Sequence, residues 1–126
     1  MAKRIQKNYT TEELKNVIIE AVEEKKGIDI TLIDFKEIHS SIFDCFIICN
    51  GLSRPQMEAI TDSIIFSVKE KFGILPKHTE GLQNAEWILI DYFDVIVHVF
   101  NQEAREFYRL ESLWADADIK TIKNNN

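Results

Sequence analysis

The sequence predicts one domain of the α/β (α+β) class, in which helices pack on a mixed sheet of about five strands. Its 126 residues, 45% hydrophobic and 29% charged, have the length and composition of a single globular domain. Apolar residues recur at helical spacing in some segments and alternate as in strands in others. We expect one domain over residues 1–126, with an ordered core over 10–116 and a frayed polar tail over 120–126.

The first third of the chain predicts a helix and two strands. Thr10 and Glu13 have the spacing of a capping box, and the apolar residues after them recur every three or four positions, so a helix is expected over 11–25. Residues 28–35 alternate between apolar and polar side chains, which is typical of a strand, and 44–50 predict a second, more buried strand.

The middle of the chain predicts a second helix and a short strand. Ser53 is a candidate cap, Pro55 falls in the first turn, and the helix should end near Phe72. Residues 74–76 are expected to form a strand parallel to 44–50, joined to it by a right-handed crossover through this helix.

The last third predicts a hairpin and a final helix. Only Tyr92 and Phe93 separate the strands expected over 87–91 and 94–100, so these strands should pair antiparallel. Asn101 is a candidate cap for a helix that fades after Trp114. The residues of this helix expected to face inward are Ala104, Phe107, Tyr108 and Leu110.

Charge and composition exclude several classes of protein. The net charge is −6, and residues 80–118 hold nine acids against two bases, which argues against a phosphate-binding surface and against direct nucleic-acid readout. This acidic third should either meet a basic partner or simply be solvated. No apolar run approaches the roughly 20 residues of a membrane span, and the N-terminus lacks a secretory signal. We expect a cytoplasmic protein without membrane association, unless a leading segment was removed beforehand.

Known catalytic motifs and metal-ligand spacings are not found in the sequence. It has no Walker loop, dinucleotide fingerprint or nucleophile elbow, and His39, His78 and His98 stand alone, so no catalytic residue, metal or cofactor is expected. Cys45 and Cys49 should lie on one face of a strand, about 13 Å apart and too far for a disulfide. Both are expected to be reduced core residues.

The strongest functional signal is the alternation along the two hairpin strands. Val95, Val97 and Val99 share one face, which is the expected core face. The opposite face is apolar with acids at its rim and holds Trp87, Leu89, Asp91, Ile96, His98 and Phe100. An exposed patch of this kind marks a partner-binding surface. The alternative is that its aromatic and histidine side chains belong to the core, and that Arg105 and Glu111 are solvated charges of the last helix.

Four segments of this region are distinctive. They are PKHTEG at 76–81, EWILID at 86–91, DVIVHVF at 94–100 and REFYRLESLW at 105–114. Together with DCFIICNG at 44–51 and the helix start at 53–59, they closely resemble the ribosomal silencing factor family (RsfS, also called Iojap), over residues 11–115. One departure is Phe93, where the family often has a glycine.

The resemblance implies a fold similar to that of nucleotidyltransferases, without their activity. It also implies binding to large-subunit ribosomal protein fourteen, which blocks joining of the small subunit and lowers translation when nutrients are scarce. The residue matching Trp87, and acids near it, would lie at that contact. A ribosomal protein is basic, so the acidic third of this chain would attract it. The resemblance also implies that such factors can self-associate, and the patch is compatible with a homodimer.

The leading hypothesis is a non-enzymatic protein that binds the large ribosomal subunit and acts by steric exclusion. Trp87 would be the apolar anchor. The acids expected to pair with basic residues of the partner are Glu80, Asp91 and Glu111. The remaining expected site residues, on the same patch or beside it, are His98, Phe100, Arg105 and Tyr108.

Two other hypotheses remain open at this point. A nucleotidyltransferase-like enzyme with a degenerate site would use residues 51–53 as its Gly-Ser turn, but the strand expected next, 74–76, carries no acids to hold metal and triphosphate. The patch could also serve homodimerisation alone.

Overall fold

The computed structural model describes residues 8–38 and 41–122. In chain order its elements are α1 (Thr11–Glu24), β1 (Ile28–Asp34), β2 (Cys45–Asn50), α2 (Arg54–Phe72), β3 (His78–Glu80), β4 (Trp87–Asp91), β5 (Val95–Phe100), α3 (Gln102–Tyr108), α4 (Leu110–Leu113) and β6 (Asp118–Thr121). None of the helices in this part of the chain is long and apolar enough to span a membrane.

The strands form one mixed sheet in the order β3-β4-β5-β2-β1-β6. Among the described strands, only β2 and β5 are parallel, and the other neighbouring pairs are antiparallel. The α/β class and the β4–β5 hairpin are therefore confirmed, with six strands in the described part of the chain in place of about five. Phe93, in the hairpin turn, has a φ of 74°, a left-handed conformation that glycine adopts more easily.

The sixth strand lies where the sequence predicts a frayed tail. β6 pairs antiparallel with β1, so the expectation for Lys120 and Thr121 is wrong. All four side chains of β6 are exposed, and the strand is held through its main chain, which leaves no apolar pattern in the sequence. Residues 123–126 of the expected tail lie outside the described residues.

The short strand after α2 is also placed differently. No strand forms at 74–76; β3 begins at His78 and pairs antiparallel with β4 at the edge of the sheet. Pro76 lacks the N–H that a strand would donate. The parallel neighbour of β2 is therefore β5, so the predicted crossover between 44–50 and 74–76 is wrong.

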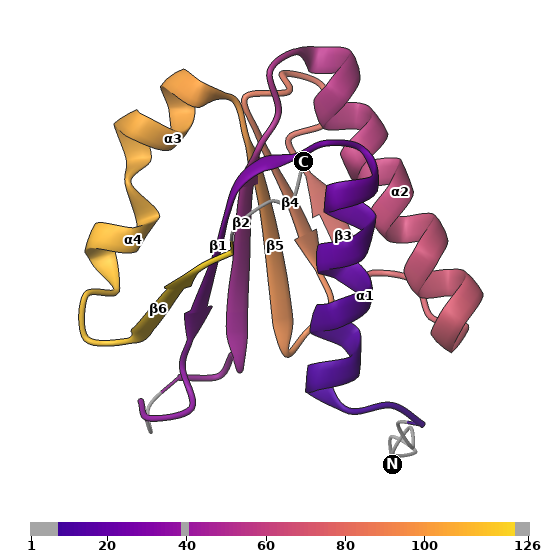
Figure 1. Cartoon of the computed structure of the whole chain (residues 1–126), viewed down its shortest axis with the longest axis vertical. Helices are drawn as coiled ribbons and strands as arrows, with labels where there is room; N and C mark the ends of the chain where they lie inside the picture. Colours follow the sequence, from indigo (N-terminus) through magenta and orange to yellow (C-terminus); the bar gives the residue numbers. More distant parts are fainter. Residues whose placement is uncertain (1–7, 39–40, 123–126) are drawn as a thin grey trace.

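Helices cover both faces of the sheet. Figure 1 shows α1 and α2 on one side of it, and α3 and α4 on the other. The valines of β5 pack under α1 and α2, and Cys45 and Cys49 are buried and reduced in the same core, as the alternation predicts. Phe100 belongs to the second core, on the face of α3 and α4.

The helix ends follow the predicted caps. Thr10 and Glu13 form a reciprocal capping box at α1, and the hydroxyl of Ser53 accepts a hydrogen bond from the backbone N–H of Gln56 at α2. The last helix is interrupted, because Arg109 has a φ of 48° and separates α3 from α4.

Candidate protein-binding surface

The second face of the sheet is only partly covered. Helices α3 and α4 bury its β1 and β2 side through Ala104 and Leu110, with Trp114 packed against the same core. On β4, at the other side, Trp87 and Leu89 remain partly exposed. We call this exposed region the Trp87 surface; it consists of Trp87, Leu89 and Tyr108, with His78, Glu80 and Asp91 at its rim.

The indole of Trp87 is held from three directions. Its ring lies 5.0 Å from that of Phe100 and 4.7 Å from that of Tyr108, measured between centroids. Its Nε1 donates a hydrogen bond of 2.9 Å to Nδ1 of His98. A partly exposed aromatic ring is thereby fixed in one orientation, which suits an anchor for a protein partner because little side-chain entropy remains to be lost.

His98 and Phe100 support this ring from below. Only 3% of His98 and none of Phe100 is exposed, so the expectation that they belong to an open patch is wrong: Trp87 and Tyr108 pack against them. Burial lowers the pKa of His98 to about 3. The imidazole is therefore neutral at neutral pH, with Nδ1 as acceptor and the proton on Nε2. Among the described residues, Nε2 has no hydrogen-bond partner.

Both rim acids, Glu80 and Asp91, lie close to His78, which is not among the predicted site residues. Nε2 of His78 lies 2.9 Å from a carboxylate oxygen of Glu80, and its Nδ1 lies 3.6 Å from Asp91. Asp91 also accepts a 2.7 Å hydrogen bond from the backbone N–H of Phe93, so it supports the hairpin turn as well. The PKHTEG segment contains His78. Because the sequence predicts a strand at 74–76, before His78, it does not show that His78 pairs with Asp91.

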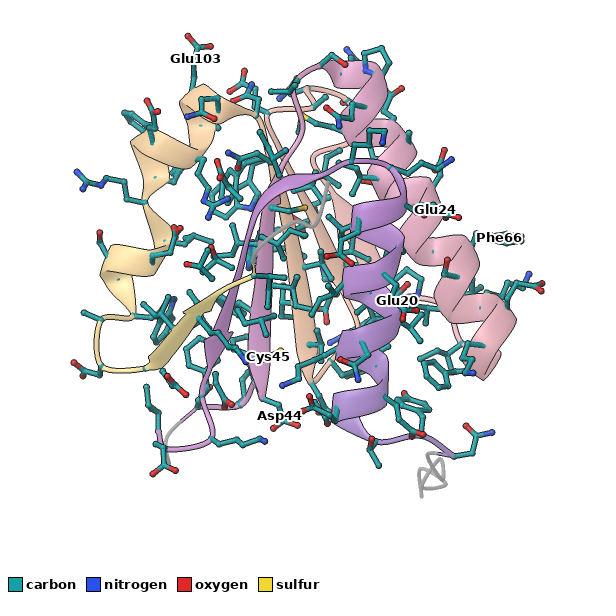
Figure 2. The ribbon with its side chains drawn as sticks, in the orientation of Figure 1. Glu20, Glu24, Asp44, Cys45, Phe66 and Glu103 are labelled. Atoms are coloured by element: carbon teal, nitrogen blue, oxygen red, sulfur yellow. The ribbon has the colours of Figure 1, made fainter. Side chains whose placement is uncertain are left out.

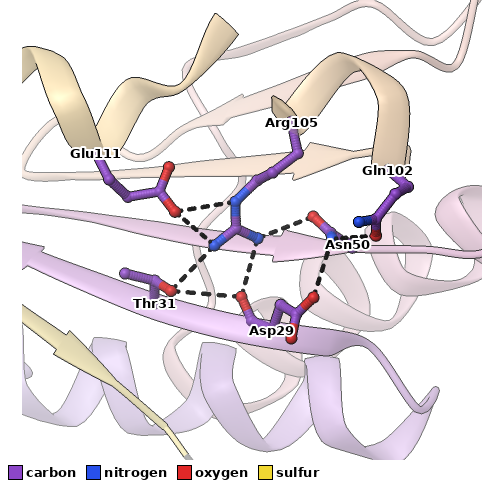
Figure 3. A network of polar contacts seen from close by, with 6 residues as sticks. All are labelled: Asp29, Thr31, Asn50, Gln102, Arg105 and Glu111. Carbon is purple, nitrogen blue, oxygen red and sulfur yellow. Dashed lines mark hydrogen bonds and ion pairs between the residues drawn. The ribbon is translucent and has the colours of Figure 1, made fainter. Parts of the chain in front are cut away.

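Arg105 and Glu111 form a network that holds α3 and α4 onto the sheet (Figure 3). The guanidinium donates to Glu111 at 2.7 and 3.1 Å, to Asn50 at 2.8 Å, to the Asp29 carbonyl at 2.9 Å and to Thr31 at 3.0 Å. The Arg105 side chain is 11% exposed and that of Glu111 31%. Glu111 is thus already paired within the chain, and neither residue is the solvated charge of the alternative interpretation.

An exposed aromatic ring extends the apolar character of the Trp87 surface along α3. Phe107 is 78% exposed, so its expected inward orientation is wrong, and its ring lies edge-on to Tyr108 at 5.0 Å. Tyr108, also expected to face inward, is 45% exposed. The predicted site residues thus form three groups: the exposed rings and rim acids, the buried pair beneath them, and the Arg105 network.

The structure assigns a structural role to the candidate turn of the alternative enzyme hypothesis. The hydroxyl of Ser53 caps α2, and the next strand is β3, in which the carboxylate of Glu80 contacts His78. In residues 8–38 and 41–122, no group of three or more His, Cys, Asp or Glu side chains is placed to hold a metal ion.

Comparison with known proteins identifies the family. The model of the family described as "Ribosomal silencing factor during starvation" matches residues 8–126. The chain is 41% identical to the ribosomal silencing factor RsfS of Halalkalibacterium halodurans over 108 residues, which cover 86% of this chain and 91% of the relative. It is 40% identical to RsfS of Bacillus subtilis over 102 residues, 81% of this chain and 85% of the relative.

A solved structure agrees with both the sequence and the fold. The crystal structure of a Chromobacterium violaceum protein superposes with a TM-score of 0.80 at 31% identity, covering 94% of this chain and 98% of that one. The match of fold, length and sequence extends over nearly the whole chain. The chain therefore belongs to the ribosomal silencing factor family.

Proposed function

We propose that this protein binds the large ribosomal subunit through the Trp87 surface and sterically blocks joining of the small subunit. The contact would be large-subunit ribosomal protein fourteen, and the effect would be lower translation under nutrient limitation. Binding and bulk suffice for this action, which needs neither catalysis nor a cofactor. The protein would act in the cytoplasm, where ribosomal subunits join.

The observation that carries the proposal is the fixed, partly exposed indole of Trp87 beside an acidic rim. An aromatic ring held by Phe100, Tyr108 and His98 can enter a pocket of a partner without first being ordered. The carboxylates of Glu80 and Asp91 lie on the same face and would attract a basic ribosomal protein.

Sedimentation with purified large subunits tests the proposal. We expect Trp87→Ala and Tyr108→Ala each to weaken binding at least about tenfold, since a central aromatic contributes about 2 kcal/mol or more to an interface. Leu75→Ala, which truncates another exposed apolar side chain (62% exposed) outside the Trp87 surface, is the matched control and should bind normally.

Two further measurements complete the test. Excess protein should shift a gradient profile from joined ribosomes to free subunits. Glu80→Gln should slow association and reduce its dependence on salt, because a rim charge acts mainly through steering. Normal binding by both aromatic variants, with their fold shown intact by circular dichroism, would contradict the proposal.

A further inference from the structure

A groove runs between α1 and α2 on the side of the sheet opposite to the Trp87 surface. It consists of three hollows of about 400, 420 and 180 Å³, each lined from both helices. The hollows adjoin one another, because they share lining residues. The residues that each line two of the hollows are Val17, Glu20, Glu24, Phe66 and Ser67. They therefore form one continuous surface feature.

Small side chains let the two helices approach closely beneath this groove. The hydroxyl of Ser63 donates a 3.0 Å hydrogen bond to the backbone carbonyl of Ala21 on α1. Ala59 and Ser67 lie about one turn before and after Ser63 on α2 and also line the groove. Small side chains thus line the groove together with larger ones such as Phe66.

Phe66 is the largest of these side chains, and the fold makes little use of it. It is 66% exposed, whereas Ile64 and Val68 on the same helix are fully buried. Figure 2 shows Phe66 projecting outward from α2, with Glu20 and Glu24 on the neighbouring α1. An exposed phenylalanine of α2 that lines two of the hollows offers apolar area to a partner.

The groove is also acidic. Four acids line it, against two bases, Lys25 and Lys71. The acids are Glu20, Glu24, Asp62 and Glu70. No ion pair joins any of the four to another residue of the described chain; Glu24 accepts a 3.4 Å hydrogen bond from Ser63. Their charges are therefore available to a cationic partner.

We propose that this groove binds a basic amphipathic helix of a partner protein. An apolar residue of that helix would pack on Phe66, and its lysines or arginines would lie along the acids of α1 and α2. The groove extends from Ala59 to Lys71, about 18 Å at 1.5 Å per residue, which is the length of about three helical turns. Because the Trp87 surface faces the other way, both surfaces can be occupied at once.

Fluorescence anisotropy on the full chain, without ribosomes, tests this proposal separately from the proposed function. The probe is a labelled three-turn amphipathic peptide built only from lysine, leucine and alanine. Its neutral counterpart has glutamine in place of every lysine. We expect the basic peptide to bind and the neutral one to bind at least about tenfold more weakly, as charge complementarity requires.

Matched variants locate the binding. Phe66→Ala, and the double variant Glu20→Gln with Glu24→Gln, should each weaken peptide binding about tenfold, whereas Phe107→Ala and the double variant Glu103→Gln with Glu106→Gln on α3 should not. Equal weakening by the α3 double variant would overturn the proposal, because it would show attraction to net charge alone. Failure of the basic peptide to bind, or unchanged binding by the groove variants, would overturn it as well.

Discussion

The indole Nε1 of Trp87 donates a hydrogen bond of 2.9 Å to Nδ1 of His98, across the pair of strands β4 and β5. The bond joins a partly exposed ring to a histidine that is only 3% exposed. Because Nδ1 accepts, the same bond selects the tautomer of His98 and sets the tilt of the indole.

Trp87→Phe should therefore destabilise the protein although it keeps an aromatic ring. Removing the indole N–H leaves a buried acceptor unpaired, which costs about 1–3 kcal/mol in the free energy of unfolding. Urea denaturation measures this cost. Trp114→Phe is the matched control, because Trp114 contributes ring packing against Phe35 and Phe46. An equal effect of the two substitutions would show that the hydrogen bond contributes nothing.

His98 should make the stability depend on pH. Burial lowers the pKa of His98 to about 3, so on acidification the unfolded chain takes up a proton at an ordinary histidine pKa of about 6.5 and the folded chain does not. The stabilisation is complete above about pH 6.5 and is lost progressively as the pH falls toward 3. From about pH 7 to 5, the free energy of unfolding should fall by about 2 kcal/mol.

Denaturation at both pH values tests this prediction. His98→Gln should remove most of the slope, since glutamine keeps a hydrogen-bond acceptor but does not titrate. If the pH dependence survives in the His98 variant, groups other than His98 cause it.

Arg105→Lys should destabilise the protein although the charge is kept. The planar guanidinium reaches Glu111, Asn50, Thr31 and the Asp29 carbonyl at once, and a single ammonium cannot span these acceptors. We expect a loss of about 2–3 kcal/mol, measured by urea denaturation.

The control for this substitution is an exposed arginine with a single partner. Arg54 pairs with Glu58 at 3.1 Å, with side chains 56% and 46% exposed. Arg54→Lys should change the free energy of unfolding by less than about 0.5 kcal/mol. If Arg105→Lys were equally mild, the network would not be what holds α3 and α4 in place.

Local features of the fold could be predicted from the sequence, and features that depend on distant partners could not. The capping box at Thr10 and the alternation along β5 depend on neighbouring residues and are confirmed. β6 depends on main-chain pairing with β1, whose paired residues lie 84 to 90 positions earlier, and has no apolar pattern. The break at Arg109 was likewise hidden, because a left-handed residue that is not glycine leaves no signal.

The same distinction between local and distant features explains which part of the Trp87 surface could be predicted. Alternation correctly placed Trp87, His98 and Phe100 on one face. It could not show which of them are covered, because Tyr108 reaches that face only when the Arg105 network attaches α3 to β1 and β2.

Gly81 is the position at which a change of the backbone is expected to shift Trp87. It has a φ of 87°, and a Cβ added there would overlap the backbone carbonyl oxygen of Trp87. Gly81→Ala must therefore displace the start of β4, in addition to the left-handed conformation that costs alanine about 1 kcal/mol.

Gly73 provides the matched control, because its φ is 71° and an added Cβ would meet nothing within 4 Å. We expect Gly73→Ala to cost about 1 kcal/mol and to leave large-subunit binding unchanged, and Gly81→Ala to cost about 2 kcal/mol or more and to weaken that binding. Equal costs in urea denaturation, with equal binding in sedimentation, would mean that β4 can shift without disturbing the Trp87 surface.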